Sequence, residues 1–242
     1  MRWAKRGQIL AAALLLFLLP LQAIGDLRVD FLEGEAFFPE QGEWVYHYRY
    51  RVPVILGEGE AEASIRDYYD LALSEMLSLV LPMYAADPDM AGQGKQEITQ
   101  DYRVTCNDAR FFSTLMTQNQ TVAGENLTTL RSQVFAVSGD FAGETLTLRG
   151  LLMVGEDSSQ LAGLVLEDVY RRIQVMRETD TAWLEMDAET LGAYFYPETQ
   201  FYADEENRAV FYLQPGDLRR DDMVVTFSYT KDQMQMLIDS AE

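Results

Sequence analysis

The residue types that carry nucleophilic chemistry are scarce in this sequence. It contains one histidine, His47, and one cysteine, Cys106. A Ser-His-Asp or Cys-His site would have to use His47 as its base. His47 shares one side of an alternating segment with Arg49 and Arg51, whose positive charge would hold the imidazole neutral. No Gly-x-Ser-x-Gly segment occurs. We therefore expect His47 to be an ordinary exposed or half-buried side chain and not a catalytic base.

Metal and phosphate sites of the usual kinds also lack their ligands. Zinc sites need several Cys or His side chains, and the sequence has one of each. Asp87, Asp89 and Gly92 match the first, third and sixth positions of a calcium-binding loop, but Ile98 stands at the twelfth, where a glutamate belongs. Residues 57–59 (Gly-Glu-Gly) lack the further glycines and the lysine of a phosphate loop. We expect a solvated loop at 87–92, and neither a metal nor another cofactor.

Glycoside hydrolysis is harder to exclude, because it needs only two carboxylates about 5 to 10 Å apart. The sequence has 39 acidic residues, and their order does not single out a pair. Helix faces, turns and N-caps account for most of them without catalysis. We therefore expect a protein that is not an enzyme and for which no catalytic, cofactor-binding or metal residue can be named.

The start of the chain is typical of an export signal. An uncharged apolar run at 9–19 follows three basic residues and ends at Pro20. A run of about 7 to 15 residues has the length found in signal peptides, whereas a membrane-spanning helix needs about 20. Residues 23–25 (Ala-Ile-Gly) form an acceptable cleavage site, which predicts a signal peptide at 1–25 and an extracytoplasmic mature chain from Asp26. An uncleaved anchor reaching Ile24 is the alternative, and would be the only membrane attachment.

Charge and cysteine content limit the partners further. Residues 26–242 hold 16 basic and all 39 acidic side chains, a balance of −23. Such a chain is repelled by nucleic acid and anionic lipid, so a charged partner should be basic. Solubility alone also explains an acidic surface. Cys106 has no second cysteine with which to form a disulfide, and it is expected on one strand face with Tyr102 and Val104 as a buried, inert thiol.

Hydrophobic periodicity predicts an α+β fold of two subdomains, each an antiparallel sheet packed with helices. A weakly patterned lead at 26–42 precedes a first subdomain at 43–138. Alternation predicts a strand at 44–52, with Pro53 at a strand end or sheet edge, and a helix at 60–81 that ends at Pro82. A meander of strands follows at 95–107, 110–121 and 127–137.

The second subdomain is predicted at 139–242. It begins with a short strand or extended segment at 144–148, followed by a helix at 159–177. Asp187 should cap a shorter helix, and a hairpin is expected at 200–203 and 209–213. A last strand at 223–229 leads to a helix that starts with the capping box of Thr230 and Gln233.

An aromatic row on the first predicted strand has two interpretations. Trp44, Tyr46, Tyr48 and Tyr50 point to one side of that strand. The row could stack on sugar rings or anchor a protein partner. The more common arrangement is a core between sheet and helix, and the apolar face of the helix at 60–81 needs such a surface. Solvent exposure of the row separates the two interpretations.

Three stretches in a fixed order resemble a known family. They are residues 48–77, containing Tyr-Arg-Val-Pro-Val-Ile-Leu-Gly before the helix; residues 141–152, which lead into the long helix; and residues 195–215, from Phe-Tyr-Pro to Phe-Tyr-Leu-Gln-Pro. Over about 44–230 the chain is similar to the extracytoplasmic region of the lysozyme-sensing anti-sigma factor RsiV and of PdaC-type peptidoglycan deacetylases, a domain family of unknown function.

The resemblance implies two α+β subdomains that act as a sensor or binding module at the cell envelope. Two departures limit it. RsiV-like proteins carry a sigma-binding segment before their membrane helix, but only residues 1–8 of this sequence precede the apolar run, so we expect neither direct sigma-factor inhibition nor a deacetylase domain. Where the family has a tyrosine-containing loop after Gln214-Pro215-Gly216, this chain has Asp217 to Asp222. If this loop contacts a ligand, we expect that ligand to differ from the one bound by the family.

Together these features predict an exported, non-catalytic binding or sensor module of the bacterial cell envelope. A lysozyme-like basic protein is one expected partner, and nucleic acid is not. The alternatives are a glycan-binding or carbohydrate-active cell-wall protein and a purely structural accessory domain. The sequence does not locate the binding surface.

Overall fold

The computed structural model describes residues 26–242 except 93, 123, 156–157 and 242. The predicted signal peptide at 1–25 therefore lies outside the described residues. Within the described part, no helix is both long enough and apolar enough to span a lipid bilayer.

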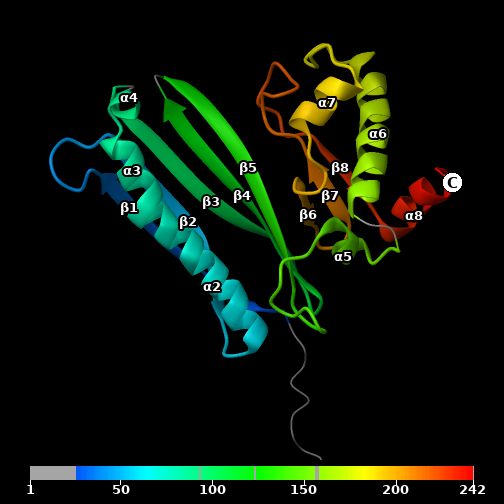
Figure 1. Cartoon of the computed structure of the whole chain (residues 1–242), viewed down its shortest axis with the longest axis horizontal. Helices are drawn as coiled ribbons and strands as arrows, with labels where there is room; N and C mark the ends of the chain where they lie inside the picture. The colour runs from blue at the N-terminus through cyan, green and yellow to red at the C-terminus, as the bar shows by residue number, and fades with distance from the viewer. Residues whose placement is uncertain (1–25, 93, 123, 156–157, 242) are drawn as a thin grey trace, which may run out of the picture.

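The first half of the chain forms a five-stranded sheet with helices on one face (Figure 1). The sheet has the order β1-β2-β3-β4-β5. Its elements are β1 (Arg28–Phe38), β2 (Tyr46–Leu56), α2 (Glu60–Glu75), the π-helix η1 (Met76–Val80), α3 (Leu81–Ala86), α4 (Pro88–Ala91), β3 (Gln96–Asn107), β4 (Phe111–Val122) and β5 (Glu125–Ala136). The predicted meander of β3, β4 and β5 is confirmed.

The α+β class is confirmed, but the first sheet is mixed and not antiparallel as predicted. β2 and β3 run parallel, from the pair Tyr46 and Gln96 to the pair Arg51 and Asp101. The helices between them carry the chain back to the starting end of β2, which makes the next strand parallel. β2 pairs with β3 only as far as Arg51, so Pro53 lies where β2 has lost its neighbour on that side. A proline is tolerated at such a position because it donates no ladder hydrogen bond.

β1 was not predicted, because residues 26–42 show only weak alternation. Most of its side chains remain exposed or half-buried, so the pattern of a core strand is faint. It nevertheless pairs with β2 along its whole length. Gly34 lies opposite Tyr50, whose ring occupies the space that a Cβ at position 34 would need.

The predicted helix at 60–81 is confirmed, but Pro82 does not end it. The chain widens into η1 and continues as α3, with Pro82 in the first turn of that helix. Proline interferes with the carbonyl of the preceding turn of an α-helix, and a widened turn directly before it relieves that conflict. Ala61, Ile65 and Tyr69 form the buried face of α2.

That helical face covers the aromatic row of β2. Tyr46 and Tyr48 are completely buried, Tyr50 is half-buried, and Tyr69 of α2 packs edge-on against Tyr102 of β3. The core interpretation is therefore correct for Tyr46 and Tyr48. It is wrong for Trp44, which lies before β2 and contacts Phe37 and His47, with ring centroids 6.1 and 5.9 Å away, on the outer face of the sheet. Tyr46 and Tyr48 are not available to stack on a sugar ring or to anchor a partner protein.

The second half contains a small antiparallel sheet in the order β6-β7-β8, with helices around it (Figure 1). Its elements are α5 (Leu148–Leu152), α6 (Ser158–Arg177), α7 (Ala188–Tyr194), β6 (Phe201–Ala203), β7 (Ala209–Tyr212), β8 (Thr226–Tyr229) and α8 (Lys231–Asp239). The Asp187 cap and the capping box of Thr230 and Gln233 are both present. The extended segment at 144–148 lies along β5, where Leu146 N–H donates to the Val134 carbonyl.

One apolar core connects the two halves. α6 contributes Leu161, Val165, Val169 and Ile173 at a spacing of four, and Cys106 belongs to the same cluster. The prediction that Cys106 shares a face with Tyr102 and Val104 is wrong. A register shift between Val104 and Cys106 turns the thiol to the other side of the sheet.

The side-chain amide of Gln214 pairs with the backbone of β5, as a residue of a neighbouring strand would. Leu130 N–H donates to Gln214 Oε1 at 2.8 Å, and Gln214 Nε2 donates to the Leu130 carbonyl at 2.8 Å. Leu130 itself is only 3% exposed. Gln214 thus satisfies both outward-facing backbone groups of an edge-strand residue and connects the two halves of the protein.

We expect Gln214→Ala to destabilise the protein by about 1–3 kcal/mol, because it leaves the amide and carbonyl of Leu130 without partners. Urea denaturation followed by tryptophan fluorescence measures this. Gln235→Ala, which removes only an exposed contact to Asp239, is the matched control and should change stability by less than about 0.5 kcal/mol. Equal stability of the two variants would show that the Gln214 contact contributes nothing.

Candidate binding surface

His47 lies on the outer face of the first sheet, as the alternation predicted. Its ring stacks on Phe37 with centroids 4.3 Å apart, and its Nε2 atom is 2.9 Å from Glu35 Oε2. Arg49 pairs with Glu97 on the same face. β1 and β3 thus place acids next to the basic residues of β2. The prediction from the sequence considered β2 alone, so it included only the positive charges beside His47. No serine or cysteine forms a hydrogen bond with His47 among the described residues.

A shallow hollow of about 580 Å³ lies on this outer face, but its charges are already paired. Arg51 forms ion pairs with Glu33 and Asp101, and its guanidinium lies 3.4 Å from the centre of the Phe31 ring. These side chains form an ordered, exposed ladder across β1, β2 and β3. Such surface pairs contribute little to stability, and they leave no strong field for a charged ligand.

Cys106 is confirmed as a buried thiol, with only 2% of its surface exposed. Burial, together with the nearby Asp108 and Asp204 carboxylates, raises the pKa of the Cys106 thiol to about 12. The sulfur lies 3.6 Å from Asn207 Oδ1 and 3.9 Å from the Phe111 carbonyl oxygen. A thiol in this environment is neither a nucleophile nor a metal ligand at neutral pH.

We expect a thiol reagent to modify Cys106 at least about 100-fold more slowly in the folded protein than in the guanidinium-unfolded protein at about pH 8. Absorbance of the released thiolate measures both rates. Rapid modification of the folded protein would contradict the assignment of Cys106 as a buried core residue.

The segment that matched part of a calcium loop uses its carboxylates locally. Asp87 Oδ1 accepts a hydrogen bond from Asp89 N–H at 2.9 Å, and the backbone between Asp87 and Gly92 forms the short helix α4. The solvated loop that was expected is thus partly helical. Among the described residues, no group of three or more His, Cys, Asp or Glu side chains is placed to hold a metal ion.

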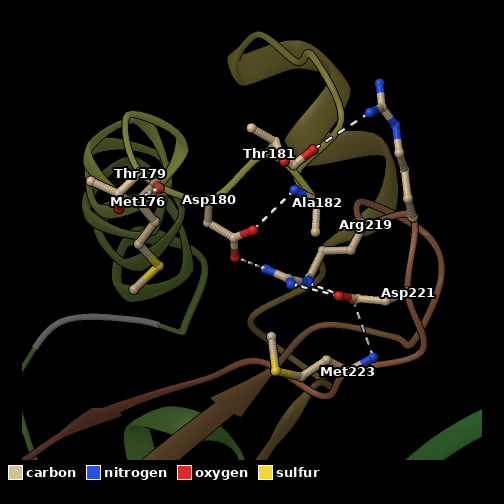
Figure 2. A network of polar contacts seen from close by, with 9 residues as sticks. Met176, Thr179, Asp180, Thr181, Ala182, Arg219, Asp221 and Met223 are labelled. Atoms are coloured by element: carbon tan, nitrogen blue, oxygen red, sulfur yellow. Dashed lines mark hydrogen bonds and ion pairs between the residues drawn. The ribbon is translucent and has the colours of Figure 1, made fainter.

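The loop after Gln214, where the sequence departs from the family pattern, is organised around Arg219 (Figure 2). The guanidinium is only 6% exposed. It donates two hydrogen bonds to Asp221, at 2.7 and 2.8 Å, and one to Asp180 at 2.7 Å. It also lies over the Trp183 ring, 4.8 Å from its centre. These contacts bind the loop to the turn that follows α6.

Backbone hydrogen bonds strengthen the same connection. Leu184 N–H donates to the Leu218 carbonyl, and Arg220 N–H donates to the Ala182 carbonyl. The buried side chain of Leu218 adds an apolar anchor. The loop at 214–225 is therefore held by Gln214 at its start, by Arg219 in its middle and by β8 at its end.

We name the exposed part of this loop, residues 220–224, the tip. It presents Asp222, Met223 and Val224 to solvent, with Met223 51% and Val224 41% exposed. Burial raises the pKa of the Asp217 carboxyl, whereas hydrogen bonds from Arg219 lower the pKa values of Asp180 and Asp221. The two carboxylates beside Arg219 are therefore ion-pair partners and not a proton donor and nucleophile. The tip thus combines the exposed charged side chains Arg220 and Asp222 with two exposed apolar side chains.

Sequence reasoning placed the change of family pattern at Asp217 to Asp222 but did not identify Arg219 as its anchor. Asp180 is far from Arg219 in the sequence, and neither residue lies in a periodic segment. The only local signal was the pair Arg219 and Asp221, two residues apart.

We expect the Arg219→Met variant to lose less stability than the unmodified protein when the pH is lowered. Because the folded-state pKa values of Asp180 and Asp221 lie below the unfolded value of about 3.9, their stabilisation is present above that pH and is lost as pH falls through the folded values. The variant should melt several degrees lower at neutral pH and lose less stability on acidification. Arg220→Met is the control, since Arg220 is exposed and forms no ion pair with an acid of the described residues. Melting temperatures from about pH 7 to about pH 3 test this. Parallel curves for all three proteins would contradict it.

Two solved bacterial structures share this architecture. A DUF3298 family protein from Bacteroides fragilis is 11% identical, with a TM-score of 0.59 over 88% of this chain and 93% of that chain. A DUF3298 family protein from Pseudomonas aeruginosa is also 11% identical, with a TM-score of 0.50 over 86% of this chain and 93% of that chain. No model of a protein family matches the sequence, and no curated protein sequence matches it.

At this identity the likeness shows the fold and nothing more. DUF3298 is the domain family associated with RsiV and PdaC, so the resemblance inferred from the sequence holds for the fold. The matched region includes both sheets, because it covers most of each chain.

Proposed function

We propose that this protein is an exported, non-catalytic binding module of the bacterial cell envelope that recognises a basic protein through the tip at residues 220–224. The observation that carries the proposal is the combination of a firmly anchored loop with an exposed tip, in which Asp222 and two apolar side chains lie beside the cation Arg220. Arg219 fixes the loop from inside, while Asp222, Met223 and Val224 face outward.

Anchoring matters because a loop that is ordered before binding loses little conformational entropy on association. Three charged hydrogen bonds and a stacked tryptophan hold Arg219. Met223 and Val224 supply apolar area that a partner can bury, and Asp222 supplies a charge at its rim. This arrangement resembles the centre and rim of protein interfaces.

Charge supports a basic partner. Residues 26–242 carry a balance of −23, so a cationic protein is attracted at long range and an anionic one is repelled. Several basic side chains are already paired with acids, for example Arg49, Arg208 and Arg219. The resemblance to RsiV adds one concrete candidate, a lysozyme-like protein. Export itself is supported by the predicted signal at 1–25.

A non-catalytic role is supported by the state of the groups that could do chemistry. His47 contacts Glu35 and Phe37, and Cys106 is buried with a raised pKa. The stacking surface that the glycan-binding alternative requires is absent at Tyr46 and Tyr48, which are completely buried in the core.

We expect the purified protein to bind a C-type lysozyme, with affinity that falls as salt rises from about 50 to about 300 mM. Asp222→Lys should weaken binding about tenfold or more, because it places a cation at the tip. Asp140→Lys makes the same change of charge at an exposed turn of the second half and should weaken binding less than about threefold. Biolayer interferometry measures these affinities.

No binding at either salt concentration would exclude lysozyme as the partner. Equal weakening by both substitutions would contradict recognition through the tip, since it would show that only net charge matters.

A further inference from the structure

A second site lies on the other face of the first sheet, between that sheet and the α2–η1 helix. A groove of about 220 Å³ opens there. Tyr68, Glu75 and Met76 line its helical wall, and residues of β3, β4 and β5 line its floor. We name it the helix–sheet groove. It is independent of the tip at 220–224 and of the proposed function.

Strand register determines which side chains share the floor. Tyr102 of β3 pairs with Met116 of β4, and Met116 pairs with Arg131 of β5. Directly paired residues point to the same face of a sheet, so these three side chains form one row. Gln100 and Gln118 form the next row in the same way.

A third row completes the floor on the opposite side. Thr114 of β4 pairs with Gln133 of β5, and the Tyr68 hydroxyl of α2 donates to Gln133 Oε1 at 3.2 Å. Amides, hydroxyls and one guanidinium thus converge beneath a helix, on a sheet face that elsewhere packs as core. A few convergent polar groups in a concave site are the usual composition of a small-molecule pocket.

Part of this polarity already serves the fold. The Tyr48 hydroxyl donates to Gln100 Oε1, and Gln100 Nε2 donates to the Tyr102 hydroxyl. The Tyr69 and Thr114 hydroxyls are 2.8 Å apart. These bonds fix the orientation of the floor before any ligand arrives.

Arg131 is not engaged in this way. It forms no ion pair with an acid among the described residues, although the chain carries a large excess of acids. Burial raises the pKa values of the Tyr68 and Tyr102 hydroxyls, and the positive charge of Arg131 opposes that rise, which is consistent with Arg131 facing both. A guanidinium forms paired hydrogen bonds with a carboxylate, so Arg131 is suited to hold one.

Glu75 lies across the groove from the sheet and is not paired with Arg131. A ligand that presents its carboxylate to Arg131 would satisfy Glu75 with a hydroxyl or ammonium group at its other end. The volume is smaller than the roughly 300 Å³ at which sites for drug-sized ligands begin, so it corresponds to a sugar ring or a dipeptide.

The helical wall has an irregularity at the same place. Met76 and Val80, the first and last residues of the π-helix η1, both line the groove. π-Helical turns are rare and are frequent at functional sites. The wider turn shifts these two apolar side chains relative to the register of α2.

From the rows of the floor, the unpaired guanidinium and the opposed glutamate, we propose that the helix–sheet groove binds a small ligand with a carboxylate at one end and a hydrogen-bond donor at the other. Arg131 holds the carboxylate, Glu75 accepts from the donor, and Gln118 and Gln133 contact the body between them. An acidic sugar and a short peptide both have this chemistry.

Two pairs of probes distinguish the sources. Glucuronate is compared with glucose, and alanyl-alanine with its C-terminal amide, each added up to about 10 mM to the purified ¹⁵N-labelled protein. We expect one carboxylate probe, and not its neutral counterpart, to shift the amide resonances of β4 and β5 around Met116 and Arg131. The responding pair identifies the sugar or the peptide as the source.

Two variants test the assigned residues. Arg131→Gln should weaken binding of the responding probe about tenfold or more, and Gln118→Glu should do the same by placing a second acid beside Arg131. Arg28→Gln removes the same charge from the exposed edge of β1 and should leave the affinity within about twofold. Dispersed amide spectra confirm that each variant is folded.

No shift with any probe would overturn the proposal. So would equal shifts with charged and neutral probes, or shifts that persist unchanged in Arg131→Gln.

Discussion

The outer edge of β5 is the constraint on which the rest of the structure depends. An edge strand exposes a row of backbone donors and acceptors, and an unprotected edge invites pairing with another chain. Here the extended segment near Leu146 covers one end of that edge, and the amide of Gln214 covers Leu130 in its middle. The second half of the protein is therefore positioned by the need to complete the first sheet.

Both candidate surfaces follow from this closure. The loop at 214–225 starts at the residue that covers β5, so its anchoring by Arg219 has a fixed origin. The helix–sheet groove uses the opposite side of the same strand, where Arg131 and Gln133 face α2. β5 thus contributes to both surfaces. Its backbone at the sheet edge positions the loop at 214–225, and its side chains form part of the helix–sheet groove.

The sequence predicted those features of the fold that depend on interactions between residues close together in the chain. Asp187, Thr230 and Gln233 act within one helical turn, and the spacing of Leu161, Val165 and Val169 is set by one helix, so these predictions are confirmed. The parallel pairing of β2 and β3 and the direction of Cys106 depend on long-range register, which periodicity does not encode.

The candidate surfaces were less predictable than the fold for the same reason. Arg219 meets Asp180 across 39 positions of sequence, and the floor of the groove combines three strands with a helix. β1 was missed because half-buried edge strands show weak alternation. The end predicted at Pro82 was wrong because an isolated proline often ends a helix, whereas here a π-helical turn precedes it and the chain continues as α3.

The bulge beside Cys106 makes the first half of the protein depend on the second. The register shift places the thiol on the sheet face that packs against Leu161 and Phe211. Without the second half, Cys106, Phe111 and Val134 would therefore form a solvent-exposed apolar patch. Burial of this patch therefore requires the second half of the protein.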